Sequence, residues 1–293
     1  MDEKKMLVSV VIPCYNSEKL ISKCLDSLVS QKTDFNYEII VVDSSKDNTP
    51  KIIKNKFPSV KLIHLNEKTF AGAGRNIGVK KSLGEIIAFI DSDCVAPDNW
   101  LKTAVESINT GYNIVGGSVK NANPSLISTA DYLMGFNEFH PNMPKKEVKF
   151  MPTCNLICKK KAFNEIGGFS PDFPIAEDTI FNYKATKKNT LLFNPKIMIL
   201  HHNRDSFEGF MTHQYNFGKY CAISRKRFKL PGKIFTKYPI LSLLIPFAKV
   251  SRITFRITRW NPKILPQFIL VLPITLLGII TWSTGFIKSA FTK

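Results

Sequence analysis

Two carboxylates separated by one residue follow an apolar run in the first third of the chain. The run is Ile86–Ile90, and the carboxylates belong to Asp91 and Asp93. Hard divalent cations prefer carboxylate oxygens, and a cation held in this way can neutralise a diphosphate. The same residue types are common in turns and helix caps, so the pair alone leaves both interpretations open.

Other polar residues stand beside further predicted elements. Asp43 directly follows the run Glu38–Val42, where its carboxylate could accept hydrogen bonds from a nucleobase or a ribose. Arg75 stands at the head of a helix-like segment and offers a planar fork for a phosphate or a base. Each has a structural alternative, a turn residue for Asp43 and a solvated surface charge for Arg75.

An acidic pair and a histidine pair complete the candidates. Glu177 and Asp178 begin a predicted helix, where a carboxylate could act as a general base or only stabilise the helix N-terminus. His201 and His202 end a predicted strand. A neutral imidazole there could be the third ligand of a metal held by two aspartates, or a purely structural group.

The segments that must position these residues alternate between strand-like and helix-like patterns. Strands are predicted at residues 8–12, 38–42, 60–65, 86–90, 155–158 and 191–200. Such alternation predicts an α/β fold with a mostly parallel sheet and helices on both faces. Ligands of these sheets bind outside the carboxyl ends of the strands, where the candidates lie. Residues 121–149 lack periodicity and are predicted to form a long loop that could contact an acceptor.

The charge of the chain is concentrated at its end. Lys and Arg number 41 against 23 acidic residues, giving +18, and residues 209–293 hold fourteen basic residues and no acid. A uniformly basic nucleic-acid-binding protein would not segregate charge in this way, and we expect no nucleic-acid partner. Residues 264–287 are 24 positions without a charge. As a helix they would measure about 36 Å, enough to cross a ~30 Å hydrocarbon core.

The segment before this apolar stretch suits a membrane surface. Arg252, Arg256 and Arg259 fall on one helical face, as in helices that lie on anionic lipid. We therefore predict a membrane-associated chain whose cationic flank, and everything before it, lies in the cytoplasm. The alternative is a pair of buried helices packed on the first region. The predicted regions are catalytic (1–208), basic and interfacial (209–263), and transmembrane or membrane-embedded (264–293).

Taken together, the motifs resemble the inverting glycosyltransferases of family 2, which have the Rossmann-like GT-A fold. The resemblance covers about residues 7–205 and depends on the order and spacing of several short segments. These segments are VSVVIPCYN at 8–16, IVVDSS at 40–45, AGRNIG at 73–78, FIDSD at 89–93, GGF at 167–169 and ED at 177–178.

The resemblance implies a role for each candidate residue. Residues implied to bind the nucleotide of a nucleotide-sugar donor are Pro13, Tyr15, Asp43, Arg75 and Asp91. Residues implied to hold Mg²⁺ or Mn²⁺ on the diphosphate are Asp91, Asp93 and His201. Asp178 is the implied catalytic base, with Glu177 on the acceptor side. The implied reaction transfers a sugar to an acceptor hydroxyl with inversion. The expected acceptor is a lipid-linked saccharide, a polyprenyl phosphate or a surface polysaccharide.

The sequence departs from the family pattern at two places. After Asp43 the family more often has a second Asp and then Gly-Ser, whereas this chain continues Ser44-Ser45. This departure weakens any inference about individual base or ribose contacts. Many members carry a further acid where Ile180 stands here.

Three other functions compete with this interpretation. A dinucleotide dehydrogenase is disfavoured because Gly72, Gly74 and Gly78 are spaced GxGxxxG and follow the third strand. A membrane-tethered nucleotidyltransferase would also use aspartates and a metal, but no glycine-rich basic loop follows the first strand. A non-enzymatic basic binding module would exploit the tail, whose aromatic residues the adjacent apolar stretch explains better.

Overall fold

The computed structural model of the chain describes residues 6–292, which form two compact units. The first unit holds the described residues up to Lys120 together with Pro144–Leu200. The second holds Asn121–Met143 and the described residues from His201 onward. The predicted region 1–208 therefore includes a segment, Asn121–Met143, that belongs to the second unit.

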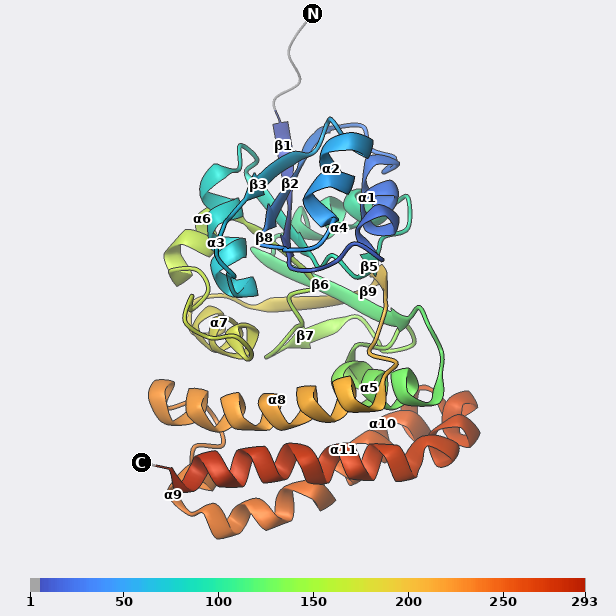
Figure 1. Cartoon of the computed structure of the whole chain (residues 1–293), viewed down its shortest axis with the longest axis vertical. Helices are drawn as coiled ribbons and strands as arrows, with labels where there is room; N and C mark the ends of the chain where they lie inside the picture. Colours follow the sequence, from blue (N-terminus) through green and yellow to red (C-terminus); the bar gives the residue numbers. More distant parts are fainter. Residues whose placement is uncertain (1–5, 293) are drawn as a thin grey trace, which may run out of the picture. The chain divides into compact units, whose positions relative to one another are not determined.

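The first unit begins with the parallel half of a sheet (Figure 1). Its strands are β1 (Met6–Cys14), β2 (Asn36–Asp43), β3 (Lys61–His64) and β4 (Ile86–Ile90), in the order β3-β2-β1-β4. β1 pairs in parallel with both β2 and β4, and β2 pairs in parallel with β3. The chain moves from β1 outward to β3 and then returns to β4 on the other side of β1. The carboxyl ends of β1 and β4 therefore flank a topological switch point.

Helices cover both faces of this half-sheet. The connecting helices are α1 (Ile21–Val29), α2 (Thr49–Lys56) and α3 (Ala71–Lys81). Right-handed crossovers place α1 and α2 on one face and α3 on the other, because the chain reverses direction after β3 (Figure 1). α1 buries Ile21, Cys24, Leu25 and Leu28, the three-to-four spacing of an amphipathic helix. The predicted α/β architecture is confirmed.

The rest of the sheet is antiparallel. β8 (Asn155–Lys159) pairs antiparallel with both β4 and β6 (Ile114–Asn121), which makes the sheet mixed rather than mostly parallel. β9 (Leu191–His201) lies between β6 and the short β5 (Cys94–Val95), and β7 (Lys146–Val148) pairs antiparallel with β9. The helices of this half are α4 (Trp100–Ile108), α6 (Lys160–Ile166) and α7 (Glu177–Ala185).

The strand β6 contains two adjacent glycines that resemble a loop in the sequence. A Cβ atom at Gly117 would lie 1.6 Å from the carbonyl oxygen of Ile197, so the glycine lets β6 approach β9. The buried side chain of Asn155 links β8, on which it lies, to β6, β9 and α4 by hydrogen bonds. Its Nδ2 donates to the carbonyl oxygens of Ser118 (2.9 Å) and Ile197 (2.8 Å), and its Oδ1 accepts from Trp100 Nε1 (2.9 Å).

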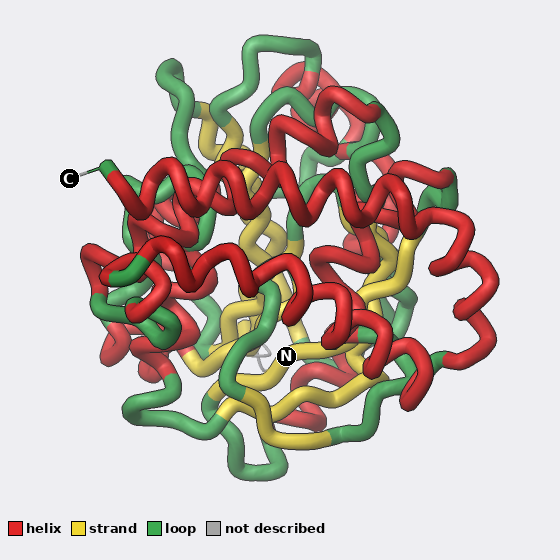
Figure 2. The backbone as a smooth tube through the Cα atoms, turned by 90° about the horizontal axis from the view of Figure 1, so that it is seen from below, coloured by secondary structure: helices red, strands yellow, loops and turns green. Residues whose placement is uncertain are grey.

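The second unit is helical. Its helices are α5 (Leu126–Phe136), α8 (Phe207–Phe228), α9 (Ile234–Lys237), α10 (Ile245–Trp260) and α11 (Leu265–Phe291). Three 3₁₀ segments join them, at Asn137–Phe139, Pro239–Leu244 and Pro262–Ile264. α11 is the long helix that leads to the C-terminus in Figure 2. Glycines bring it close to α8, since a Cβ at Gly218 would lie 1.9 Å from the carbonyl oxygen of Trp282.

The prediction of a loop over residues 121–149 is wrong for α5 and β7. α5 begins with a reciprocal capping box, in which Ser125 Oγ accepts from the Ser128 backbone N–H and Ser128 Oγ accepts from the Ser125 backbone N–H. These bonds satisfy two donors that a helix N-terminus otherwise leaves unpaired. The box uses Ser in place of the usual Glu or Gln, and the buried face of α5 carries Thr129 and Asp131, which masks its apolar periodicity.

The C-terminal apolar helix is confirmed. Within residues 6–292, one helix, at Pro262–Phe291, is long and apolar enough to cross a membrane by length and composition.

Candidate active site

The helix α3 approaches the sheet through its glycines, and this approach sets the position of Arg75. A Cβ at Gly78 would lie 2.4 Å from Val11 Cγ1, and a Cβ at Gly74 would lie 3.4 Å from Pro13 Cβ. Without these glycines, α3 would stand farther from β1. The close contact brings Arg75 to the carboxyl end of the sheet.

We expect Gly78→Ala to destabilise the chain by about 1–3 kcal/mol, because the added methyl overpacks the contact with Val11. Gly135→Ala is the matched control. A Cβ at Gly135, also in a helix, meets nothing within 4 Å, so this change is expected to be neutral or to stabilise by up to about 1 kcal/mol. Thermal unfolding of the full chain in neutral detergent checks both. Combining Gly78→Ala with Val11→Ala should recover part of the loss, and strictly additive effects would contradict the contact.

Arg75 joins three elements of the site. Its side chain is 2% exposed. Nη2 donates to Asp91 Oδ1 (2.6 Å) at the end of β4, and Nη1 donates to Glu177 Oε1 (2.7 Å) at the start of α7. The guanidinium carbon lies 5.4 Å from the centroid of the Phe169 ring. Burial alone would lower the pKa of Arg75, but the two carboxylates outweigh it and raise the pKa. The arginine is therefore a fixed cation that holds two acids at the sheet edge.

Asp178, the predicted base, follows Glu177 directly. Its Oδ1 accepts a 2.6 Å hydrogen bond from the backbone N–H of Thr179. Burial, and then the charge of Glu177, raise the pKa of Asp178 to about 7, although Thr179 and Arg75 act in the opposite direction. A carboxyl group with a pKa near neutrality is well suited to accept a proton at physiological pH. Ala176, just before the pair, has a left-handed backbone (φ 74°), a strained conformation for a non-glycine residue.

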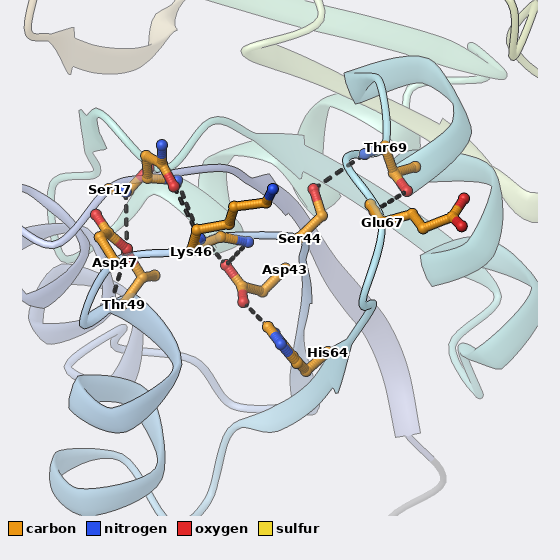
Figure 3. Close-up of polar contacts among 11 residues, drawn as sticks. Ser17, Asp43, Ser44, Lys46, Asp47, Thr49, His64, Glu67 and Thr69 are labelled. Atoms are coloured by element: carbon orange, nitrogen blue, oxygen red, sulfur yellow. Dashed lines mark hydrogen bonds and ion pairs between the residues drawn. The ribbon is translucent and has the colours of Figure 1, made fainter.

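Asp43 lies at the end of β2 (Figure 3), and its side chain is fully buried. Its Oδ1 accepts from Ser45 Oγ (2.5 Å), and its Oδ2 lies 2.6 Å from His64 Nδ1. His64 was not among the predicted residues. It ends β3 in register with Asp43, but in the sequence it lies inside the predicted strand 60–65, so no local pattern marked it as a residue of the sheet edge.

Hydrogen bonds connect the segment after β1 to the segment after β2. Asn16 has a left-handed backbone (φ 50°), its N–H donates to Ser45 Oγ (2.6 Å), and its Oδ1 accepts from the Lys46 backbone N–H (3.0 Å). Ser44 Oγ accepts from the Thr69 backbone N–H (3.1 Å; Figure 3). Ser45 thus bonds to both Asp43 and Asn16, at a position where the family more often has other residues.

Tyr15 and Pro13 border the same edge. Tyr15 is 37% exposed, and Lys68 Nζ lies 4.4 Å from the centroid of its ring. Pro13 is partly buried against α3. An exposed aromatic face beside a lysine can stack on a base and attract a phosphate.

Asp91 and Asp93 are both partly exposed at the end of β4. Ser92, between them, shares a 2.8 Å hydrogen bond with Ser17 Oγ, which ties this turn to the segment after β1. His201 ends β9, is buried, and belongs to the second unit, where its Nδ1 lies 3.0 Å from Asn203 Oδ1. Its role as a metal ligand stays a prediction.

The first unit therefore brings together most of the predicted residues. Arg75, Asp91 and Glu177 are in direct contact, and Asp178 stands next to them. Pro13, Tyr15 and Asp43 follow the neighbouring strands. The arrangement places a buried cation, two partly exposed carboxylates and a carboxyl group of raised pKa at one edge of a sheet.

Comparisons with known proteins identify the family to which the sequence is similar. The sequence model described as "Glycosyl transferase family 2" matches residues 9–167. Glycosyltransferase AglE of Haloferax volcanii is 29% identical over 218 residues, 72% of each chain. Glycosyltransferase GlyG of Streptococcus pneumoniae is 28% identical over 216 residues, 67% of this chain and 69% of that protein.

Two solved structures share the fold. The mannosyltransferase PcManGT from Pyrobaculum calidifontis, in complex with GDP-Man and Mn²⁺, aligns over 95% of this chain and 86% of its own, with a TM-score of 0.62 and 19% identity. S. aureus TarS in complex with UDP-GlcNAc aligns over 96% of this chain and 90% of its own, with a TM-score of 0.52 and 19% identity.

Proposed function

The chain belongs to glycosyltransferase family 2, and on that premise we propose that it transfers a sugar from a nucleoside-diphosphate sugar to an acceptor hydroxyl with inversion. One observation carries the proposal. The buried Arg75 links Asp91, a donor-side carboxylate, to Glu177, whose neighbour Asp178 has a raised pKa. One side chain, that of Arg75, thereby bonds both to the proposed donor-side carboxylate and to the residue next to the proposed base. The nucleotide sugars bound by PcManGT and TarS support this class of donor.

Each group then has a distinct task. Pro13, Tyr15 and Asp43 border the nucleotide. Asp178 accepts the proton of the acceptor hydroxyl as the oxygen attacks the anomeric carbon from the face opposite the departing diphosphate. One displacement inverts that carbon. Glu177 lies on the acceptor side and, through Arg75, helps to hold Asp91 in position.

The residues at the end of β4 fit a divalent cation. Asp91 and Asp93 offer hard oxygen donors and both are partly exposed, while Arg75 contacts only Oδ1 of Asp91. We propose that these two aspartates hold Mg²⁺ or Mn²⁺. The cation would neutralise the negative charge of the departing nucleoside diphosphate. The Mn²⁺ complex of PcManGT supports this proposal.

The test uses the membrane-bound full chain with a panel of UDP-, GDP- and dTDP-sugars. We expect release of one nucleoside diphosphate with Mn²⁺, loss of at least roughly 10²-fold in rate with chelator, and recovery on adding metal back. Asp93→Asn should reproduce the chelator effect, whereas Asp26→Asn, an exposed carboxylate on α1, should not. The anomeric configuration of the product, read by NMR, tests inversion. If none of the donors in the panel is turned over, the proposed glycosyltransferase activity is contradicted.

We also propose that the second unit lies in the plane of a membrane surface. One side of α11 packs on α8, through Gly278 against Phe210 and Gly285 against Tyr215. The other side is apolar and exposed, at Ile269, Leu270, Leu276, Leu277 and Ile280. Exposed apolar surface of this extent beside cationic flanks is typical of a lipid-facing surface. Regions 209–263 and 264–293 together would form this surface, and a lipid-linked or surface-polymer acceptor suits such a location.

The contact with α8 argues for an in-plane rather than a crossing α11. Lys226 Nζ of α8 donates to the carbonyl oxygens of Ser289 (3.1 Å) and Thr292 (2.6 Å), so the two helices stay together to the end. α8 also carries Lys219, Arg225 and Arg227. Moving α11 across the bilayer would carry these charges into hydrocarbon, at about 2.5–3.5 kcal/mol each near the centre.

Single introduced cysteines test this orientation. All six native cysteines are buried, so we expect them to react little with a maleimide and to give low background labelling. If α11 lies in the plane, Thr292→Cys and the exposed Leu83→Cys should react with an impermeant maleimide from the same, cytoplasmic side of the membrane. Labelling of Thr292→Cys from the opposite side would show that α11 crosses.

A further inference from the structure

The second unit contains a cavity that the glycosyl-transfer site does not use. Its volume is about 430 Å³, within the range of small-molecule sites. α8, α10, α11 and the segment around Gly232 all contribute to its lining. Three basic side chains and several apolar ones form its wall.

The basic side chains are Arg225, Lys249 and Arg252, and within the described part of the chain none of them forms an ion pair with a carboxylate. Arg225 Nη1 donates only to a neutral acceptor, the carbonyl oxygen of Cys221 (2.9 Å). Lys249 Nζ lies 3.4 Å from the centroid of the Trp282 ring. Burial lowers the pKa of Lys249 to about 7; Cys221 acts in the opposite direction, and the charges of Arg225 and Arg252 lower the pKa further. Three cations held near one another without an acid would be stabilised by a bound anion.

Trp282 supplies a second, independent feature of the cavity wall. Its side chain is 5% exposed, and its indole Nε1 is buried with no hydrogen-bond partner. A buried N–H donor without an acceptor costs about 1–3 kcal/mol. Trp282 also contributes its aromatic ring to the cavity wall, where the ring lies beside Lys249 Nζ.

The apolar part of the wall continues onto the surface. Phe235, Leu244 and Phe286 line the cavity. Leu244, just before α10, is 61% exposed, and Phe247, in the first turn of α10, is 73% exposed. An alkyl chain leaving the cavity along this path would therefore stay in contact with apolar side chains.

We propose that this cavity binds a phosphate group attached to an apolar chain, with Arg225, Lys249 and Arg252 around the phosphate and Phe235, Leu244 and Phe286 around the start of the chain. The ligand class is thus an anionic amphiphile. The site needs no bound sugar donor, so it stands apart from the proposed glycosyl transfer.

The test must distinguish binding of the phosphate by the cations from binding of the alkyl chain by the apolar wall. It compares octyl phosphate with inorganic phosphate and with octanol. Each is titrated calorimetrically into the full chain in neutral maltoside detergent, with titration into micelles as the blank. We expect octyl phosphate to bind one-to-one, at least tenfold more tightly than either of the other compounds. Equal affinity for inorganic phosphate would overturn the role of the apolar chain, and equal affinity for octanol would overturn the role of the cations.

Matched variants distinguish the cavity from general attraction to a basic surface. Lys249→Gln and Arg252→Gln should each weaken octyl phosphate binding at least tenfold, and Arg252 is exposed, so its change leaves the packing intact. Lys263→Gln removes an exposed cation that does not line the cavity and should bind normally. An equal loss in Lys263→Gln, or undiminished binding by Arg252→Gln with an unchanged melting temperature, would overturn the proposal.

Discussion

Replacing Asp178 by asparagine is expected to lower kcat by roughly 10²–10⁴-fold and to leave the Kd for the sugar donor nearly unchanged. The asparagine Oδ1 can still accept the 2.6 Å bond from the Thr179 backbone N–H, so the local structure should persist. What disappears is the carboxylate that we propose takes the proton from the acceptor hydroxyl. Transfer rates at saturating donor, together with calorimetric donor binding, separate these two effects.

The pH dependence of the unmodified enzyme tests the same assignment. Because only the ionised carboxylate accepts a proton, and its pKa is raised to about 7, kcat/KM should rise with pH and reach half its plateau near pH 7. Asp26→Asn, the exposed control, should keep both the rate and the profile. Normal transfer by Asp178→Asn would remove Asp178 from the role of base. Loss of donor binding in that variant would place the residue in the donor site instead.

The parallel half of the sheet was predictable because its pattern is local. β1, β2 and β4 each contain a run of apolar residues, and Asp43 ends β2 while Asp91 directly follows β4. Parallel strands bring those ends to one edge, so the neighbourhood of the residues predicted to bind the donor followed from topology alone. The antiparallel strands were harder, since Gly116-Gly117 in β6 resembles a turn until its close contact with β9 is known.

The connections within the site were not predictable from the sequence. Arg75 and Glu177 are 102 positions apart, and no local pattern pairs them. The sequence offered Arg75 as a fork for a phosphate or a base, yet both of its terminal nitrogens are bonded to carboxylates in the folded chain. The same limit applies to His64, whose contact with Asp43 depends on the register of β2 and β3. Long-range pairing of charged groups is a property of packing rather than of residue type.

Replacing Arg75 by methionine is expected to destabilise the chain by about 3–5 kcal/mol, because Asp91 and Glu177 would lose their shared cation. Activity should fall as well, since both the donor-side carboxylate and the start of α7 lose their anchor. Arg75 also lowers the pKa of Asp178, so the rising limb of the pH profile should move to higher pH in this variant. Thermal unfolding and kcat/KM against pH are the two measurements.

Glu177→Gln should have the opposite effect on the pKa of Asp178, because the charge of Glu177 raises that pKa. Its pH profile should therefore move to lower pH, in the direction opposite to that of Arg75→Met. Arg75→Lys keeps the charge but cannot bond both carboxylates with a planar fork, and it should fall between methionine and the unmodified enzyme in stability. Shifts of the same sign in Arg75→Met and Glu177→Gln would mean that the two residues affect Asp178 only through the packing of α7. Opposite shifts would show that this ion pair sets the charge state of the base.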